Sequence, residues 1–321
     1  MLPTADDVMA AAHRLDGVAE RTPLRHSPTL SASTGADIFL KCENLQRTGS
    51  FKLRGAYNAL ATLPAESRAA GIVASSAGNH GLGVALSARL LGVRARIFMP
   101  ADAPRVKRDG IIALGAEVDQ SQPHYDAAHA AAVAYGAEHG MTFVNPCAGR
   151  PLLAGQGTVA VEVLAELPAV CTVVVPVGGG GLVGGIGAYL RGVAPGVRVV
   201  GVQSEHTNAM ALSFDAGHRV EIGYAPTLAD GLAGQIDDEG LAIGRFAIDE
   251  MCVVSEAQVA DAIAWLAQVH DLRVEGSGAV GVAALRAGLG GDWHGPMAVV
   301  ISGGNIDDGR WKSIIERTVA T

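Results

Sequence analysis

Lys52 lies in a sequence setting that would suit covalent chemistry on a carbonyl compound. The surrounding segment reads TGSFKLRG over residues 48–55. Ser50 has the residue type of a helix N-cap, and residues 51–60 are expected to form the helix that it begins. The positive end of the helix dipole disfavours an ammonium group in the first turn, and a dry site would favour the neutral amine further. A neutral lysine can form a Schiff base, whereas the alternative is an ordinary solvated lysine on a helix surface.

A turn rich in serine and glycine could bind an anion. Residues 75–81, with the sequence SSAGNHG, lie between a predicted strand at 72–74 and a predicted helix at 82–91. Backbone N–H groups at a helix start bind carboxylate or phosphate, Ser76 adds a hydroxyl, and Asn79 can both donate and accept. A capped turn without a ligand explains this segment equally well. For His80 we expect a supporting or structural role rather than that of a general base.

Four consecutive glycines separate a predicted strand at 173–177 from a predicted helix that starts at Leu182. They are Gly178, Gly179, Gly180 and Gly181. Such a run costs much backbone entropy and lets several amides point at one group, so we predict that it binds a phosphate. A further turn, SGGN at 302–305, follows the last predicted strand. Its small residues leave room for a flat ring beside Ser302, although a tight turn alone also explains them.

The same glycines admit a second interpretation, a dinucleotide-binding fingerprint. Gly179, Gly181 and Gly184 satisfy G-x-G-x-x-G after a strand, and Glu205 follows the next strand at about the 20-residue spacing that this motif requires. An NAD-dependent dehydrogenase is therefore an open alternative, although it leaves the segments around Lys52 and Asn79 unexplained. The sequence contains neither a P-loop nor a G-x-S-x-G nucleophile elbow.

These residues must be positioned by strands and helices that alternate along the chain. Strands are expected at 38–40, 72–74, 95–99, 142–144, 173–177, 197–202, 251–254 and 297–301, with helices that include 82–91, 126–138, 158–167, 182–190 and 257–269. This alternation predicts an α/β fold with parallel sheets covered by helices on both faces. Ligands in such folds bind where strands run into loops at their carboxyl ends. Three of the four segments directly follow a predicted strand, and the segment of Lys52 lies where a loop runs into a predicted helix.

Composition restricts the partners and the location. The chain has 321 residues, a net charge of −8 and a sequence pI of about 5.7, which favour neither nucleic acid nor an anionic membrane as a partner. Residues 167–190 carry no charge, but Pro176 and the glycines after it would break a membrane helix. Acidic residues near the N-terminus replace the basic region of a signal peptide, which predicts a cytoplasmic protein. The cysteines are expected to be buried, reduced thiols rather than metal ligands: Cys42, Cys147, Cys171 and Cys252.

Taken together, the segments resemble the threonine/serine dehydratase and serine racemase family of pyridoxal-phosphate enzymes, which has the tryptophan synthase β-like fold (fold type II). The matching motifs are ENLQ at 43–46, SFKLRGA at 50–56, SAGNH at 76–80, AGQGT at 154–158, GGGGL at 178–182, ADG at 229–231, EGSGA at 275–279 and SGGN at 302–305. Their joint order along nearly the whole chain is specific. The resemblance implies a large pyridoxal-phosphate-binding domain of residues 1–49 plus 144–321, with a small domain of residues 50–143 inserted in it.

The resemblance also implies a role for each matching residue. Lys52 would hold pyridoxal 5'-phosphate covalently, Phe51 would pack near its ring and Asn79 would hydrogen-bond its phenolic oxygen. Ser302 would face the pyridine nitrogen. The phosphate would be bound by the backbone amides of Gly178, Gly179, Gly180, Gly181 and Leu182. The substrate carboxylate would be bound by Ser76, Ala77, Gly78, Asn79 and His80, with Gln156 as a further contact.

The reaction that the resemblance implies is β-elimination from a 3-hydroxy amino acid. L-Threonine and L-serine are the first candidates, and the products would be a 2-oxo acid and ammonia. The substrate amine would displace Lys52, and the freed amine would remove the α-proton before the β-hydroxyl leaves with help from the cofactor phosphate. A neutral serine beside the pyridine nitrogen makes the ring a weaker electron sink than an aspartate would, which favours loss of a β-leaving group. Family membership further implies a homodimer.

Three departures from the family pattern bear on the choice within it. Racemases of this type carry a serine where this chain has Ala77, which cannot transfer a proton, so dehydration is expected instead. The stretch that binds a divalent cation in some members keeps Glu205 but has Ala211 in place of an aspartate, so no metal site is expected. Residues 145–147 read Asn-Pro-Cys where relatives often have His-Pro and an aromatic residue. The preferred substrate therefore stays open, with 3-hydroxyaspartate dehydratase, amino-acid racemase, β-replacement enzyme and a non-catalytic cofactor carrier as alternatives.

Overall fold

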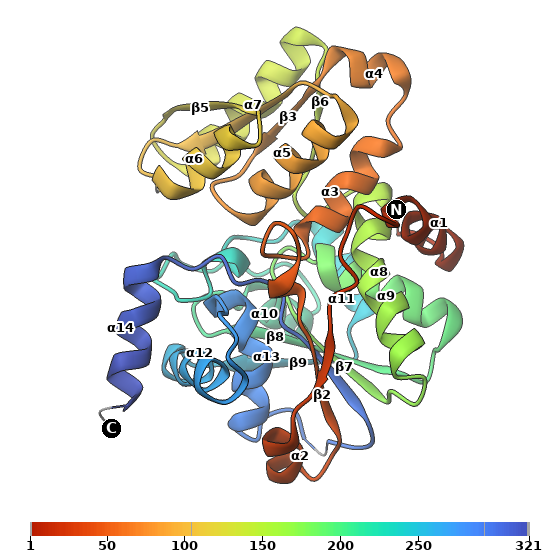
Figure 1. Cartoon of the computed structure of the whole chain (residues 1–321), viewed down its shortest axis with the longest axis vertical. Helices are drawn as coiled ribbons and strands as arrows, with labels where there is room; N and C mark the ends of the chain where they lie inside the picture. Colours follow the sequence, from red (N-terminus) through yellow and green to blue (C-terminus); the bar gives the residue numbers. More distant parts are fainter. Residues whose placement is uncertain (1, 104, 292, 320–321) are drawn as a thin grey trace.

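Two sheets organise the chain in the computed structural model, which describes residues 2–103, 105–291 and 293–319 (Figure 1). The strands are β1 (Leu24–His26), β2 (Ile38–Lys41), β3 (Ile72–Ser75), β4 (Ala95–Pro100), β5 (Glu117–Gln122), β6 (Thr142–Phe143), β7 (Thr172–Pro176), β8 (Arg198–Ser204), β9 (Glu250–Val254) and β10 (Met297–Val300). The helices of the first half are α1 (Ala5–Leu15), α2 (Pro28–Thr34), η1 (Glu43–Leu45), α3 (Lys52–Ala61), α4 (Ala65–Ala70), α5 (Asn79–Leu91), α6 (Arg105–Ala113), α7 (Tyr125–His139) and α8 (Arg150–Glu166). Those of the second half are α9 (Gly181–Val193), α10 (Ala209–Ala216), η2 (Asp230–Leu232), α11 (Asp238–Ala247), α12 (Glu256–His270), α13 (Gly276–Arg286) and α14 (Asp308–Val319).

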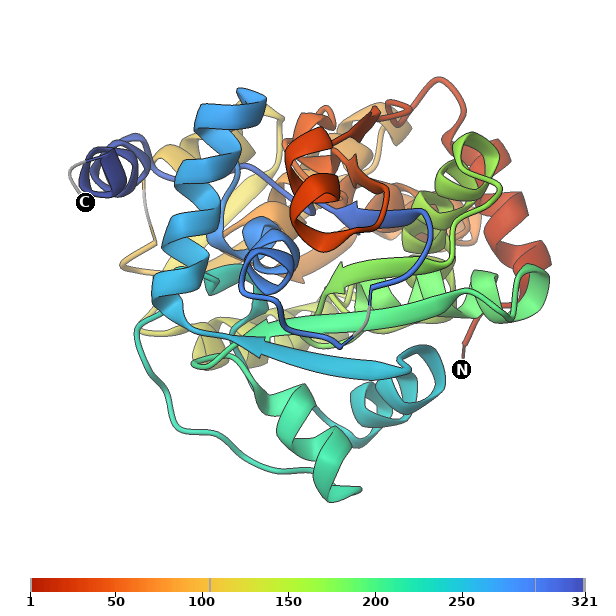
Figure 2. The same cartoon turned by 90° about the horizontal axis from the view of Figure 1, so that it is seen from below.

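The larger sheet has six strands in the order β1-β2-β10-β7-β8-β9. The pairs between the predicted strands are parallel, as expected, and β1, which was not predicted, adds an antiparallel edge beside β2. Side chains alternate along the central strand: Val174 packs into a core with α2, α12 and α13, whereas Val173 and Val175 pack into a core with α1, α8 and α9. Figure 2 shows this sheet between its helical layers from below. Helices thus cover both faces of the sheet, as predicted.

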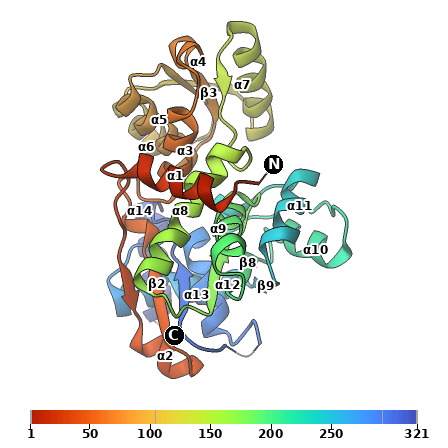
Figure 3. The same ribbon diagram turned by 90° about the vertical axis from the view of Figure 1, so that its right-hand side faces the viewer.

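The smaller sheet has four parallel strands in the order β5-β4-β3-β6. Ile72, Ala74 and Ile97 pack against α3, α5 and α6 on one face, and Val73 and Phe98 pack against α7 on the other. In Figures 1 and 3 this sheet and its helices lie above the larger sheet, with α3 between them. Below, the larger sheet with its helices is called the large domain and the smaller sheet with its helices the small domain. The limits of 50 and 143 stay a prediction.

The predicted elements are present, with differences that concern the site. Each predicted strand is found with small shifts at its ends, while β1 and the polar edge strand β5 were not expected. Helix α5 begins at Asn79 rather than at residue 82, which places Asn79 and His80 in its first turn. Helix α8 begins at Arg150 rather than at residue 158, so Gln156 lies inside it.

The cysteines and the uncharged stretch can be compared with their predictions. Cys42 and Cys252 are buried, but Cys147 is only partly buried and Cys171 is exposed, so the expectation of four buried thiols is wrong for these two. Their positions explain the difference, since Cys171 lies just before the first residue of β7 and Cys147 lies in the loop before α8. Among the described helices, none has both the length and the apolar character needed to span a membrane.

Candidate active site

Lys52 is the first residue of α3, and its side chain points toward a loop of the large domain. Its Nζ atom donates a hydrogen bond to the Pro146 carbonyl oxygen at 2.9 Å and lies 5.2 Å from the centre of the Phe51 ring. The predicted N-cap role of Ser50 is wrong, because the cap position is Phe51 and no side chain caps the helix there. Ser50 is instead buried and forms a β-bridge with Gly303, which ties the start of α3 to the loop after β10.

The first turn of α3 is held from two directions. The Phe51 N–H donates to the Ser302 carbonyl oxygen at 3.1 Å, so Ser302, just past the end of β10, lies next to the lysine segment. The Gly55 N–H donates to Gln156 Oε1 at 3.2 Å, and Gln156 is completely buried in α8. Gln156 therefore satisfies one of the free N–H groups of the helix start and fixes the backbone that carries Lys52.

A buried cluster of charges anchors the same helix to the large domain. The Arg54 guanidinium binds both oxygens of Glu43 at 2.8 Å and both oxygens of Glu162, at 2.6 and 3.0 Å. Lys41 Nζ donates to Glu162 at 2.6 Å. Burial acts to raise the pKa of Glu43, but the charge and hydrogen bonds of Arg54 outweigh it and hold that pKa below its usual value. The two negative and two positive charges of this cluster therefore balance, and Arg54 at its centre is two residues along the chain from Lys52.

The four glycines form the turn from β7 into α9. Gly180 has a φ of 92°, a left-handed conformation that glycine adopts without strain. Among the described residues, no backbone or side-chain acceptor bonds to the N–H groups of Gly179, Gly180 and Gly181. Cys147 packs directly on this turn, since a Cβ at Gly179 would lie 2.9 Å from its sulfur. Open amides at a helix N-terminus fit a phosphate, and the Pro146–Cys147 segment places them beside Lys52.

Asn79 lies at the N-terminus of α5, and its side chain crosses to the large domain. Its Nδ2 atom donates to Glu275 Oε1 at 2.7 Å, and its Oδ1 atom accepts a hydrogen bond from Asn305 Nδ2, also at 2.7 Å. In the turn before the helix, the Gly78 N–H donates to Ser76 Oγ at 3.1 Å. The serine- and glycine-rich turn of the small domain thus meets the SGGN turn of the large domain.

Ser302 is buried at the start of the SGGN turn. It is 3% exposed, and its hydroxyl donates to the Ser277 carbonyl oxygen at 3.4 Å, a long bond that leaves the oxygen lone pairs free. Lys52, the glycine turn, Ser302 and Asn79 therefore converge from four segments that are far apart in the sequence.

His80 is buried and neutral. Its Nε2 atom hydrogen-bonds the Val144 carbonyl oxygen at 3.1 Å, so the ring holds the small-domain turn against the end of β6. Burial, together with the nearby charge of Lys52, lowers the pKa of His80 to about 3. The ring is therefore uncharged near neutral pH, in line with a supporting role.

Replacing His80 by glutamine should change how stability depends on pH. In wild type the unfolded state takes up a proton near the usual histidine pKa of 6.5, whereas the folded state does so only near pH 3. His80 therefore contributes a loss of about 1.4 kcal/mol of unfolding free energy per pH unit as the pH falls below 6.5. Urea unfolding at pH 7.5 and pH 5 should show a smaller loss for His80→Gln than for wild type. Equal losses in the two proteins would contradict this reading.

Three charged residues near the site were not predicted. Glu275 is 7% exposed, and burial together with the charge of Asp230 raises its pKa to about 7. Lys107 Nζ lies 3.7 Å from Asp230 and within 4.0 Å of the space that a Cβ at Gly78 would occupy. The signal in the sequence was Glu275 itself, a lone acid in the otherwise small and neutral EGSGA motif.

Glu205 and Ala211, which lie in the stretch that binds a divalent cation in some relatives, each form a hydrogen bond within the large domain. Glu205 Oε1 accepts a hydrogen bond from the Glu256 N–H at 2.9 Å, at the start of α12. The Ala211 N–H donates to Gln203 Oε1 at 2.8 Å. Within the described ranges, no group of three or more His, Cys, Asp or Glu side chains is arranged to hold a metal ion.

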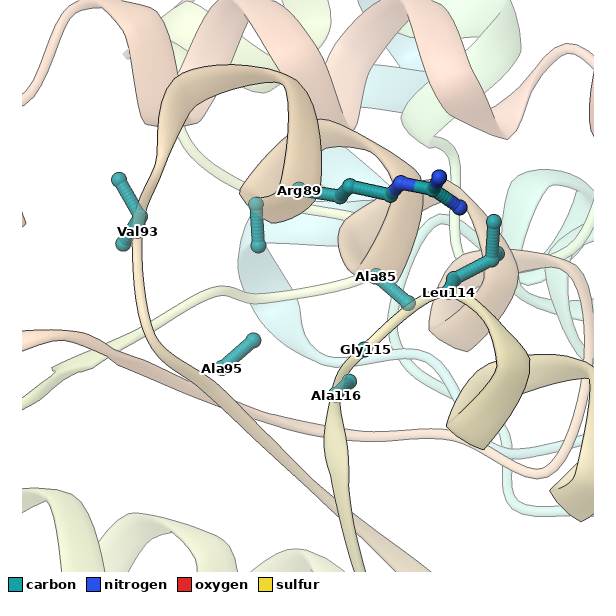
Figure 4. A pocket seen from close by; sticks show the side chains of 8 residues that line it. Ala85, Arg89, Val93, Ala95, Leu114, Gly115 and Ala116 are labelled. Atoms are coloured by element: carbon teal, nitrogen blue, oxygen red, sulfur yellow. The ribbon is translucent and has the colours of Figure 1, made fainter.

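Two cavities lie near the small sheet rather than over Lys52. A cavity of about 150 Å³ has walls of small aliphatic side chains, Ala85, Ala95 and Ala116, with Arg89 along one side (Figure 4). A larger one of about 480 Å³ lies between α5, α6 and the loop before α3, and Asn305 forms part of its wall. Neither includes Lys52 or the glycine turn in its lining.

Comparison with known proteins places this geometry in a family. The family model described as pyridoxal-phosphate dependent enzyme matches residues 15–303. An L-threonine ammonia-lyase from Thermotoga maritima is 44% identical over 306 residues, which are 95% of this chain and 76% of that protein. An L-threo-3-hydroxyaspartate ammonia-lyase from a Pseudomonas species is 38% identical over 317 residues, 98% of this chain and 99% of that protein. The structure of maize serine racemase superposes with a TM-score of 0.93 at 30% identity, covering 100% of this chain and 99% of that one.

These matches confirm the resemblance found in the motifs and the fold that it implied. The family model extends over most of the chain, including the segments of Lys52, Asn79 and the glycine turn. It also favours pyridoxal phosphate over the nicotinamide alternative, whose acid, Glu205, is engaged at the start of α12. The chain belongs to the family of pyridoxal-phosphate dependent enzymes, with a tryptophan synthase β-like fold.

Proposed function

We propose that this protein is an ammonia-lyase that eliminates the β-hydroxyl group of L-threonine or L-serine and releases a 2-oxo acid and ammonia. The observation that carries the proposal is the position of Lys52 Nζ, 2.9 Å from the Pro146 carbonyl oxygen, beside the open amides of the glycine turn. A reactive amine next to a phosphate site is what covalently held pyridoxal phosphate requires. The two ammonia-lyases described above support the reaction type.

The residues of the site suit the separate groups of the cofactor. Ser302 would contact the pyridine nitrogen, Asn79 the phenolic oxygen, and Phe51 the ring. Contacts across the Ser50–Gly303 bridge support this grouping, because they bring Ser302 and the Asn79 turn to the start of α3. The phosphate would be bound at the N-terminus of α9 by the amides of Gly178, Gly179, Gly180, Gly181 and Leu182.

The chain supplies a base and a carboxylate site for the elimination. When bound, pyridoxal phosphate supplies an electron sink that makes the α-proton of the attached amino acid acidic. Lys52 Nζ would accept that proton as the Cα–H bond breaks, and the β-hydroxyl group would take up a proton and leave as water with the electron pair of the C–O bond. The released enamine would become an imine, which takes up one water and yields the 2-oxo acid and ammonia. The turn of Ser76, Ala77, Gly78, Asn79 and His80 would bind the substrate carboxylate through the first N–H groups of α5. Gln156 would support the site by holding the first turn of α3, since its Oε1 atom accepts a hydrogen bond from the Gly55 N–H.

The substrate is tested by measuring ammonia and 2-oxo acid release from a panel of hydroxy amino acids. We expect the highest kcat/KM with L-threonine or L-serine. L-threo-3-Hydroxyaspartate is the second candidate, because the Pseudomonas relative matches over nearly its full length and Lys107 adds a cation beside Gly78. Release from none of these substrates by protein that holds the cofactor would contradict an ammonia-lyase.

Ala77 predicts little racemisation. A methyl group cannot donate a proton to the face of the substrate opposite Lys52. Reprotonation of Cα from that face should therefore be slow compared with elimination. Ala77→Ser should raise the rate of D-serine formation from L-serine by about tenfold or more, because it introduces a hydroxyl group that can transfer a proton. Chiral chromatography of the products measures both rates. D-Serine as the main product of the wild-type protein would contradict the assignment.

We also propose that the protein is a cytoplasmic homodimer. Exposed apolar side chains such as Leu212 and Phe246, 41% and 46% exposed, support a further contact surface on α10 and α11. Light scattering should give about twice the chain mass of 32.7 kDa. A mass of one chain at micromolar concentration would contradict the dimer.

A further inference from the structure

Glu275 is a buried acid whose side chain does not serve its own helix. It occupies the N-cap position of α13, but its carboxyl group makes no capping bond there. Its backbone N–H donates to the Gly303 carbonyl oxygen at 3.1 Å, which fixes it against the SGGN turn. The carboxyl group instead points across to Asn79 of the small domain. A buried carboxyl group directed away from its helix calls for another role.

The Asn79 amide is held at both of its ends. Glu275 Oε1 accepts from Nδ2, and Asn305 Nδ2 donates to Oδ1, each at 2.7 Å. Asn305 is fixed in turn, because the same Nδ2 atom donates to the Thr48 carbonyl oxygen at 2.8 Å. One N–H of the Asn79 amide is thereby used by Glu275, and the second N–H is left for a ligand.

This pattern of donors and acceptors is matched only when Glu275 is ionised. A carboxylate accepts from Asn79 and from the Asn305 backbone without donating. A protonated carboxyl group adds an O–H donor that needs an acceptor. The nearby acceptor is Asn79 Oδ1, but turning the amide to offer it would bring Nδ2 against Asn305 Nδ2, donor against donor. Protonation of Glu275 therefore disturbs the position of Asn79.

The charges around Glu275 come from two elements. Asp230 in η2 and Lys107 in α6 lie 3.7 Å from each other, while α5 and the segment after β10 present the neutral Asn79 and Asn305. Burial and Asp230 raise the pKa of Glu275, and Lys107 and the two asparagines lower it, with the result at about 7. The protonation of this group is therefore poised within the physiological range.

We propose that ionised Glu275 is the positioning residue for Asn79, holding its amide so that the second N–H faces pyridoxal phosphate, and that protonation of Glu275 releases this orientation. The inference rests on the proposed function, in which Asn79 contacts the cofactor. It goes beyond that function because Glu275, which does not itself contact the cofactor, would set the pH range in which Asn79 holds the cofactor correctly.

The test follows the visible absorption band and the dissociation constant of pyridoxal phosphate in the holoenzyme from about pH 5.5 to about pH 9. In wild type, the dissociation constant should rise about tenfold on the acid side, the effect of one charge-assisted hydrogen bond, with a midpoint near 7. Glu275→Gln keeps the shape of the side chain but fixes the protonated pattern. It should bind with the acid-side constant at every pH and lose the transition.

Two variants outside the buried core distinguish this role from a structural one. Asp230 is 52% exposed and Lys107 is 26% exposed, so their substitution should leave folding intact. Asp230→Asn removes the charge that raises the pKa of Glu275 and should move the midpoint to lower pH. Lys107→Met removes the charge that lowers it and should move the midpoint to higher pH. A structural role alone predicts no such opposite shifts.

The outcomes separate this inference from the proposed function. Borohydride trapping of the cofactor on Lys52 in wild type and in Glu275→Gln shows that the site itself is intact. With trapping intact, a Glu275→Gln protein that keeps the wild-type transition, or midpoints that fail to move in opposite directions, would overturn the role of Glu275. Absence of cofactor from Lys52 in wild type would instead refute the proposed function.

Discussion

Lys52→Ala should lower turnover of L-threonine or L-serine by at least about 10³-fold, because it removes both the covalent attachment of the cofactor and the base that accepts the α-proton. The side chain has room to be shortened without loss of folding, since it is only partly buried and makes one hydrogen bond, to Pro146. Ammonia release in a coupled assay measures the loss.

A matched control tests whether the loss belongs to Lys52. Lys107→Met removes another lysine, which lies beside Gly78 and Asp230, and leaves the attachment point of the cofactor in place. It should retain far more activity than Lys52→Ala at saturating substrate. Activity of Lys52→Ala close to that of wild type would show that another residue carries the chemistry.

Arg54→Leu should have the largest effect on folding, a loss of about 3–5 kcal/mol in the free energy of unfolding. The guanidinium is 1% exposed and binds two carboxylates, Glu43 and Glu162. Without it, Glu43 is buried without its guanidinium partner, and Lys41 alone balances two acids. Urea unfolding followed by circular dichroism measures the change.

The surface pair of Arg21 and Glu166 provides the comparison. It joins the same residue types at 3.1 Å, but the Arg21 side chain is 61% exposed. Solvent screens such a pair, so Arg21→Ala should cost no more than about 1 kcal/mol. Equal losses for Arg54→Leu and Arg21→Ala would mean that the buried cluster does not anchor α3.

The fold was largely predictable because strand and helix alternate in the sequence and glycines mark the junctions. The exceptions have physical reasons. Helix α8 was placed too late because Pro151, Gly155 and Gly157 weaken its pattern. Two of these residues are required by packing: a Cβ at Gly155 would collide with the backbone of Arg54, and one at Gly157 would lie 2.6 Å from the Gly185 carbonyl oxygen. Strand β5 was missed because all its side chains except that of Val118 are polar and none is fully buried.

The candidate site was predictable where a role depends on the backbone and less so where it depends on distant partners. The glycine turn and the turn before α5 can be recognised from their residue types and spacing. Glu275 could not be assigned from the sequence, because its importance arises from Asn79, 196 residues away, and from Asn305. The N-cap role of Ser50 failed because tertiary pairing with Gly303 replaced local capping.

The central claim is that pyridoxal phosphate is held covalently by Lys52, and borohydride reduction followed by peptide mapping tests it most directly. The purified protein should be yellow, and reduction should fix one cofactor per chain on the peptide that contains Lys52. Phosphopyridoxyl label on a different lysine, or a colourless protein that binds NAD and gives no labelled peptide, would contradict the account.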